Sequence, residues 1–215
     1  MNQSLKKAKD SFFQNCQYVS RAPGSYFWSG EHAVMYGQLA VVHPLPLYAY
    51  VGIEQGNFSE FEFEVRGIKK KANIFPRTLN VDDIEPIDQW HEKERVKKYL
   101  EFWAEKNKQP CFKTKIWFEV PPKCGLNSSG AIGASLAGLI QIIEAKEKDR
   151  PDVVKRINNW NSKPIVDLKK DTLFKKTFLD AWILDDCSHG FSSSGNGPFC
   201  SLVGSPNGQL VMYFT

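Results

Sequence analysis

The sequence predicts an α+β fold in which a mixed sheet and its helices pack in two layers. Two observations lead to this prediction. Apolar and polar residues alternate over residues 58–66 and 112–120, as they do in strands with one buried face. Residues 88–106, 128–144 and 172–186 instead place their apolar side chains at helical spacing. Strands and helices follow one another without an internal repeat, so we expect residues 1–215 to form a single domain.

The first part of the chain is expected to contribute strands. Residues 1–15 are a polar lead-in that predicts a short helix. Residues 18–37 combine aromatic and β-branched residues with Pro-Gly and Ser-Gly breaks, which predicts two short strands joined by turns. Residues 46–54 predict a further strand, and residues 58–66 predict a half-buried antiparallel strand.

The middle of the chain predicts a loop, a helix and a strand. Residues 67–87 are rich in Lys, Asp and Pro and predict a long loop. Residues 88–106 carry Trp90, Val96, Leu100 and Trp103 at helical spacing, so their aromatic residues are expected to lie in the core. The strand at 112–120 follows.

A turn at residues 121–131 reads Pro-Pro-Lys-Cys-Gly-Leu-Asn-Ser-Ser-Gly-Ala and opens a largely buried helix from Ser128 to Glu144. A helix start leaves backbone N–H groups unpaired, and the positive end of the helix dipole lies there, so the turn could bind an anion. The sequence contains no Gly-x4-Gly-Lys-[Ser/Thr] and no Gly-x-Gly-x-x-Gly, which excludes the Walker and Rossmann loops. Taken alone, the turn predicts either a phosphate cradle or a purely structural helix cap.

The last third of the chain is less regular. Residues 151–171 are charged, and their pattern assigns no clear secondary structure. Residues 172–186 predict a helix. Residues 188–198 form a second loop of small residues. Two strands are expected at 199–204 and 209–214, joined by a hairpin turn at Ser205-Pro206-Asn207-Gly208.

Composition excludes several classes of protein. The chain is 42% hydrophobic and 24% charged, as globular domains are. Its net charge of +4 is spread in short lysine clusters, which is weak support for a nucleic-acid partner. Five cysteines without a Cys-x-x-Cys pair argue against a disulfide framework or a zinc site. With no signal-peptide pattern and no apolar run of about 20 residues, we expect a cytoplasmic protein without membrane association.

Three stretches, in order along the chain, resemble the motifs of the GHMP kinases, the superfamily of galactokinase, homoserine kinase, mevalonate kinase and phosphomevalonate kinase. Arg-Ala-Pro-Gly at 21–24 with Gly-Glu-His-Ala-Val at 30–34 resembles the first motif of mevalonate kinases. Residues 121–131 resemble the second motif, Pro-x3-Gly-Leu-x-Ser-Ser. The stretch from His189-Gly190 to Asn196 resembles the loop His-Gly-x-x-Ser-Gly-x-Asp of mevalonate kinases.

The resemblance implies a GHMP-kinase N-terminal domain with a left-handed βαβ unit, whose C-terminal partner domain is absent or truncated here. It also implies ATP and Mg²⁺ as cofactors. By position in the motifs, Ser129 and Asp185 would bind the metal, with Asp186 as the fallback, and oxygen ligands suit a hard cation. The phosphates would lie on Lys123, Cys124, Gly125, Leu126, Asn127, Ser128, Ser129, Gly130 and Ala131.

The same resemblance places the acceptor near Glu31, His32, His189 and Gly190, and the catalytic positions at Ser25, His32 and Asn196. Two of these depart from the family. Mevalonate kinases have an aspartate where Asn196 stands, and an amide cannot accept a proton as a carboxylate can. They have a lysine where Ser25 stands, so a cation near the transferred phosphate is missing.

The predicted reaction is transfer of the γ-phosphate of ATP to a hydroxyl of a small metabolite, with a mevalonate-like acceptor favoured. Transfer without the acid could be substrate-assisted or purely electrostatic, or it could use an acceptor placed differently. The alternative is a catalytically impaired module that only binds a nucleotide. A Ser/His hydrolase using Ser193 or Ser129 with His189 is weakly supported, because no Gly-x-Ser-x-Gly elbow occurs. A homodimer is the expected assembly if a partner must enclose the site.

Overall fold

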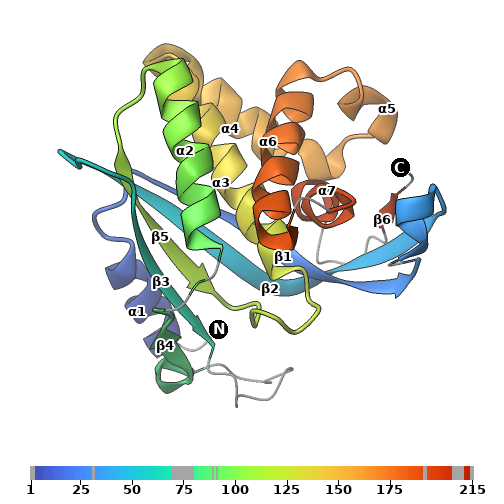
Figure 1. Ribbon diagram of the computed structural model, residues 1–215, viewed down its shortest axis with the longest axis horizontal. Coiled ribbons are helices and arrows are strands. Elements are labelled where there is room, and N and C mark those ends of the chain that lie inside the picture. Colours follow the sequence, from blue (N-terminus) through green and yellow to red (C-terminus); the bar gives the residue numbers. More distant parts are fainter. Residues whose placement is uncertain are drawn as a thin grey trace.

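A six-stranded mixed sheet organises the computed structural model, which describes residues 3–30, 32–68, 80–88, 90, 92–190, 193–204 and 211–213 (Figure 1). The strands run in the order β1-β2-β5-β3-β4, and β6 pairs with β2. All pairs are antiparallel except β3 with β5. Their bounds are β1 Tyr18–Ser29, β2 Ala40–Gln55, β3 Glu62–Ile68, β4 Ile84–Pro86, β5 Phe112–Phe118 and β6 Val211–Tyr213.

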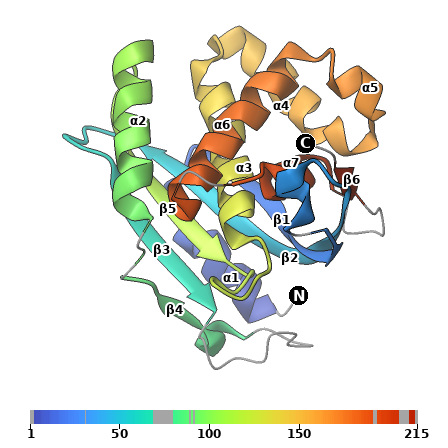
Figure 2. The ribbon, with the colours of Figure 1, turned by 45° about the vertical axis from the view of Figure 1, so that its right-hand side comes forward.

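Helices cover the two faces of the sheet unequally. One short helix, α1 (Gln3–Phe12), lies under the sheet, whereas the other helices lie above it (Figure 1). A turned view shows α2 at the β3 side of the sheet and α7 at the β6 side (Figure 2). The upper layer contains α2 Lys93–Asn107, α3 Ser128–Glu144, α4 Arg150–Asn158, α5 Ile165–Leu168, α6 Thr172–His189 and α7 Asn196–Val203.

Helix α3 is the centre of the upper layer, because it is apolar on almost every side and buried from Gly130 to Ile143. Ser135, the polar exception on the sheet side, donates its hydroxyl hydrogen to the carbonyl of Ala49 at 3.2 Å. At Gly133 a Cβ atom would lie 2.7 Å from the carbonyl oxygen of Ala181, so the glycine allows α6 to pack closely against α3. This contact fixes where the start of α3 and the end of α6 lie relative to each other.

Helix α1 is held under the sheet by a buried ion pair and an aromatic cluster. Lys9 Nζ lies 2.8 Å from Glu119 Oε1, and each side chain is 7% exposed. Phe12 and Trp117 pack with ring centroids 5.5 Å apart. Glu119 directly follows β5 and precedes the turn that leads into α3, so α1 supports the strand end from which that turn departs.

Most predicted elements are confirmed, and helix 128–144 has the predicted bounds. Within the 18–37 stretch, the two short strands were wrong: residues 18–29 form one long strand, and a 3₁₀ helix follows at Ala33–Tyr36. The 58–66 strand begins at Glu62 and pairs antiparallel with β4, as predicted, but parallel with β5 on its other side. Strand β4 lies inside the predicted 67–87 loop. The 88–106 helix begins only at Lys93.

The predicted strand at 199–204 is also wrong, because residues 196–203 form helix α7. Strand β6 does lie within the predicted 209–214 stretch, but it pairs with β2. The hairpin turn at 205–208 lies outside the described residues. No helix among the described residues is long and apolar enough to cross a membrane.

Candidate functional site

The turn before α3 has an unusual backbone. Lys123, Gly125 and Asn127 have φ angles of 62°, 69° and 58°, in the left-handed region. Asn127 is the residue before the first turn of α3, but its side chain makes no capping hydrogen bond to that turn. The first N–H groups of α3 are therefore not capped from within the helix and can serve an anion.

Asn127 instead ties the turn to the start of α7. Its Nδ2 donates to the carbonyl of Gly197 and to the hydroxyl of Ser201, both at 3.0 Å. Ser201 in turn donates its hydroxyl hydrogen to the carbonyl of Pro23 at 2.8 Å. The structure thus joins the three motif stretches predicted to form one site, and Ser25 N adds a bond to Leu126 O at 3.1 Å.

A buried carboxylate faces the turn from the end of α6. Asp185 is 3% exposed and accepts a hydrogen bond of 2.5 Å from the hydroxyl of Ser193 on its Oδ2. Its Oδ1 accepts no hydrogen bond from the described residues and has only the ring of His189 nearby, with Nδ1 at 3.4 Å. The neighbouring Asp186 is used differently, because its Oδ1 accepts the backbone N–H of Ser193 at 2.6 Å.

The imidazole of His189 is expected to be protonated at neutral pH. The neighbouring carboxylate of Asp185 raises the pKa of His189 to about 9, against the opposing effect of partial burial, and His189 Nδ1 also lies 3.0 Å from the backbone carbonyl of Asp185. The half-exposed imidazolium therefore contributes positive charge beside the carboxylate at the end of α6.

These groups line one cleft of about 560 Å³ between the start of α3, the end of α6 and the loop before α7. Its wall contains Phe27, His32, Glu92, Lys123, Gly125, Leu126, Asn127, Ser128, Ser129, Asp185, Ser188, His189, Ser193, Ser194 and Gly197. Hydroxyl groups, a carboxylate and an uncapped helix start therefore converge on one space.

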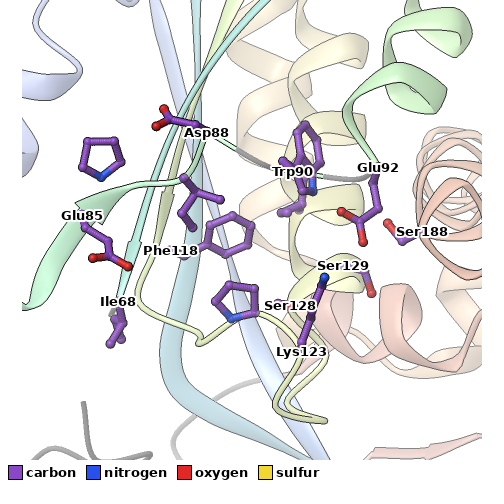
Figure 3. Close-up of a pocket in the computed structure, with 14 residues that line it drawn as sticks. Ile68, Glu85, Asp88, Trp90, Glu92, Phe118, Lys123, Ser128, Ser129 and Ser188 are labelled. Atoms are coloured by element: carbon purple, nitrogen blue, oxygen red, sulfur yellow. The ribbon is translucent and has the colours of Figure 1, made fainter. Parts of the chain in front are cut away.

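A second pocket of about 370 Å³ adjoins the cleft and is more apolar. Figure 3 shows Trp90 and Glu92 near Ser129, Ser188 and Lys123, and Glu85 farther along the pocket. The two spaces share Glu92, Lys123, Ser128, Ser129 and Ser188 as lining residues. The pocket is otherwise lined by Ile68, Glu85, Pro86, Ile87, Asp88, Trp90, Phe118, Pro122 and Ile132.

Sequence analysis did not identify Trp90, Glu92 or Ser188 as site residues. Trp90 was assigned to the apolar face of a helix, but that helix begins three residues later, and the indole is only partly buried at the pocket. A helix start after Trp90 could have been suspected from the sequence, because Asp88 interrupts the apolar pattern.

The two departures from the family motifs are buried next to lining residues of the cleft but do not line it themselves. Ser25 and Asn196 are both 0% exposed, and neither lines the cleft. Burial raises the pKa of the Cys200 thiol to about 12, and the nearby Ser25 side chain opposes this increase. Cys200 lies one helical turn after Asn196 in α7, so all three side chains belong to one buried cluster. The side-chain amide of Asn196 has no hydrogen-bond partner among the described residues.

The remaining predicted residues are distributed as follows. His32 lines the cleft, and Gly190 ends α6 with a φ of 65°. Cys124 is exposed on the turn, whereas Gly130 and Ala131 are buried inside α3. Glu31 lies outside the described residues.

Known proteins resemble this chain in structure rather than in sequence. No protein-family model and no curated protein matches it. A crystal structure of mevalonate kinase matches 92% of this chain and 54% of its own length, with a TM-score of 0.56 and 13% identity. The structure of Methanococcus jannaschii mevalonate kinase matches 92% of this chain and 53% of its own length, with a TM-score of 0.52 and 15% identity.

A third solved structure, L. major mevalonate kinase in complex with R-mevalonate, covers 92% of this chain and 52% of its own length. Its TM-score is 0.51, at 14% identity. The chain spans about half the length of each of these structures. It therefore has the α+β fold that these mevalonate kinase structures display over about half of their length.

Proposed function

We propose that this protein binds Mg·ATP in the cleft and transfers the γ-phosphate to a hydroxyl of a small metabolite, with a mevalonate-like acceptor favoured. One observation carries the proposal: the uncapped start of α3, with Ser128 and Ser129, opens into the same cleft as the buried carboxylate of Asp185. A helix start attracts phosphate, and a carboxylate beside a hydroxyl attracts a hard cation.

The adjoining apolar pocket suits the base of the nucleotide. Trp90, Ile68 and Ile132 give it flat and aliphatic walls, and it meets the cleft at Ser128 and Ser129. A base held there would place its phosphates along the start of α3. Lys123 lines both spaces and supplies a cation where they meet, while Glu92 lies within reach of a ribose hydroxyl at the same junction.

The residues present fit a magnesium ion. Oδ1 of Asp185 is buried without a hydrogen-bond donor among the described residues, and the Ser129 hydroxyl lines the same cleft. Ser129 and Asp185 would hold the ion, with Asp186 engaged by the backbone of Ser193. When bound, Mg²⁺ neutralises charge on the β- and γ-phosphates.

The protein's own groups would then position the reactants. Backbone N–H groups at the start of α3 and the Lys123 ammonium bind phosphate oxygens, and His32 and His189 face the acceptor side of the cleft. The acceptor oxygen bonds to the γ-phosphorus as the bond to the β-phosphate oxygen breaks, and ADP leaves. Because no carboxylate stands at Asn196, the hydroxyl proton passes to a phosphate oxygen or to water.

A second candidate function is nucleotide binding without transfer. It is favoured by the burial of Ser25 and Asn196, which carry neither the cation nor the acid of the family and do not reach the cleft. In this case the nucleotide would regulate the protein or an associated partner.

ADP formation separates the two candidates. Purified protein with Mg·ATP is incubated with R-mevalonate and with a panel of sugar and amino-acid alcohols, and ADP is measured by a coupled assay. Acceptor-dependent ADP release that is lost in Ser129→Ala supports transfer. A protein that binds Mg·ATP but releases no ADP with any acceptor supports the binding module.

A further inference from the structure

Strand β1 forms one edge of the sheet, and its Pro23 end is joined to the proposed nucleotide site by hydrogen bonds through Ser201 and Asn127. It pairs only with β2 among the described strands, so its other side is open. From Tyr18 to Pro23 the register with β2 is regular, and its first irregularity comes after Pro23. An open strand edge presents backbone donors and acceptors that another extended chain can pair with.

The register identifies which backbone groups face outward. Pro23 has no N–H, and its carbonyl accepts the Ser201 hydroxyl instead of a bond from β2. The backbone groups of alternate residues point to the same side of a strand. Arg21 and Val19 lie two and four residues before Pro23, so their N–H and C=O groups point outward as well. The open edge is bounded by Pro23 at one end and by Gln17 at the other, whose N–H donates to Ile53 O at 3.0 Å.

A groove of about 800 Å³ follows this edge and shares no lining residue with the cleft or the apolar pocket. On the helix side it is lined by small and aliphatic residues, including Ala134 and Gly138 of α3 and Val154 of α4. At Gly138 an added Cβ would make an ordinary van der Waals contact with Ser20 Oγ at 3.9 Å, so a small residue at this position lies directly above the strand. Val19 is 48% exposed and Val154 36%, which leaves apolar surface on both walls.

The opposite side of the groove is aromatic and positively charged. Arg21 lies over the ring of Tyr48, with Cζ 4.6 Å from the ring centroid, and Tyr50 lies beside it in the lining. Of the described residues that line the groove, Arg21 is the only one with a formal charge, and no acid is among them. The groove is therefore complementary to a negatively charged side chain.

We propose that this edge binds an extended peptide segment by adding it to the sheet as a strand antiparallel to β1. Two residues of the segment pair with Val19 and Arg21 and make four main-chain hydrogen bonds. The side chains of the bound segment alternate between the two faces of the sheet, so the protein selects side chains of the segment on each face. The residue opposite Arg21 is acidic and shares its face, and the residue opposite Ser20 is aliphatic and contacts Val154.

A blocked pentapeptide, acetyl-Thr-Glu-Val-Val-Thr-amide, is the probe for this proposal. Its Glu is placed opposite Arg21 and its central Val opposite Ser20. Titration into ¹⁵N-labelled full-length protein should shift amide signals of residues 18–22 and of Val154, and should slow amide exchange at Val19 and Arg21. The amide signals of residues 123–129 in the nucleotide site should not move.

Matched controls separate strand addition from unspecific contact. The same peptide N-methylated at Glu and at the second Val cannot donate to β1 and should not bind. Arg21→Glu should weaken the Glu peptide at least about tenfold and should bind a peptide with Lys in place of Glu more tightly. Equal binding of the N-methylated peptide, or equal binding by Arg21→Glu, overturns the proposal.

Two further results would also overturn it. One is no amide shift at residues 18–22 at millimolar peptide. The other is spontaneous formation of a disulfide-linked dimer by the Ser20→Cys variant. If two copies paired through their β1 edges about a two-fold axis at residue 20, the two cysteines would lie within disulfide distance, and the second copy would occupy the edge in place of a peptide.

Discussion

Asn127 adopts a left-handed backbone conformation that usually falls to glycine, and its side chain explains why an asparagine stands there. The amide fills space left by two glycines, since a Cβ at Gly130 or Gly197 would lie 2.1 or 2.2 Å from its Oδ1. Its Nδ2 serves two acceptors of α7. Asn127 thus positions the turn, and in the proposed function it acts on the nucleotide through that turn.

Replacing Asn127 tests this role. Asn127→Asp keeps the shape but turns an acceptor toward the carbonyl of Gly197, so we expect the free energy of unfolding to fall by about 1–3 kcal/mol. Asn127→Gly loses the bonds but gains backbone freedom, and should cost less. Urea denaturation measures both, with Ser201→Ala as the control for the shared acceptor. Equal stability of the Asp variant and the native protein would contradict the role.

His189 predicts a pH-dependent contribution to stability. Its folded-state pKa of about 9 lies above the ordinary value of 6.5 because the carboxylate of Asp185 lies beside the imidazole. The stabilisation is complete below pH 6.5 and is lost as the pH rises through 9. Because the side chain is half exposed, solvent screening should keep the effect below about 1 kcal/mol.

An NMR titration of the imidazole checks the shifted pKa of His189 directly. Asp185→Asn should return that pKa toward 6.5, and His189→Gln should be less stable than the native protein at pH 6 but not at pH 10. A pKa near 6.5 in the native protein would refute the predicted pairing.

At the scale of single residues, the sequence predicted that the turn at 121–131 and Asp185 belong to one site, because each was identified from a stretch that resembles a family motif, and both line the same cleft. It could not place Trp90 or Glu92, because their contact with Ser129 depends on how α2 approaches α3 across the sheet. Nor could it show that Ser25 and Asn196 are fully buried, since burial there depends on the packing of α7.

Among the secondary-structure elements, α3 was predicted with its bounds because an apolar pattern over 17 residues has few alternatives. The α7 helix was missed because Phe199, Leu202 and Val203 favour a strand by propensity. Packing against α3 overrides that preference, and Pro198 is tolerated because it stands in the first turn of the helix. Alternation predicted a half-buried strand at 58–66 but could not reveal that β4 lies antiparallel on one side of it and β5 parallel on the other.

Helix α1 provides a test at this scale. Lys9→Met removes the cation and leaves Glu119 buried without its partner, so we expect the free energy of unfolding to fall by about 3–5 kcal/mol. The double variant Lys9→Met/Glu119→Leu buries no unpaired charge and should recover much of that loss. Chemical denaturation of the three proteins measures both effects. A Lys9→Met protein within about 0.5 kcal/mol of the native one would show that α1 contributes little through this pair.

For the molecule as a whole, one sheet brings together residues from the two ends of the chain. Pro23, Asn127 and Ser201 are joined by hydrogen bonds although they are far apart in sequence. The sequence indicated this convergence only through the resemblance of three motifs, since no local pattern links them. The proposed nucleotide cleft and the β1 edge have different lining residues, so the two proposals can be tested separately.

Magnesium-dependent binding of ATP, measured by isothermal titration calorimetry, tests the proposed site most directly. The native protein should bind ATP with Mg²⁺ and more weakly with EDTA, and Ser129→Ala and Asp185→Asn should each weaken binding at least about tenfold. Ser162→Ala, in the 3₁₀ helix Trp160–Ser162 outside the cleft, is the matched control and should bind as the native protein does. If the folded native protein binds no ATP in the presence of Mg²⁺, or if Ser129→Ala and Asp185→Asn bind it unchanged, the cleft is not the nucleotide site.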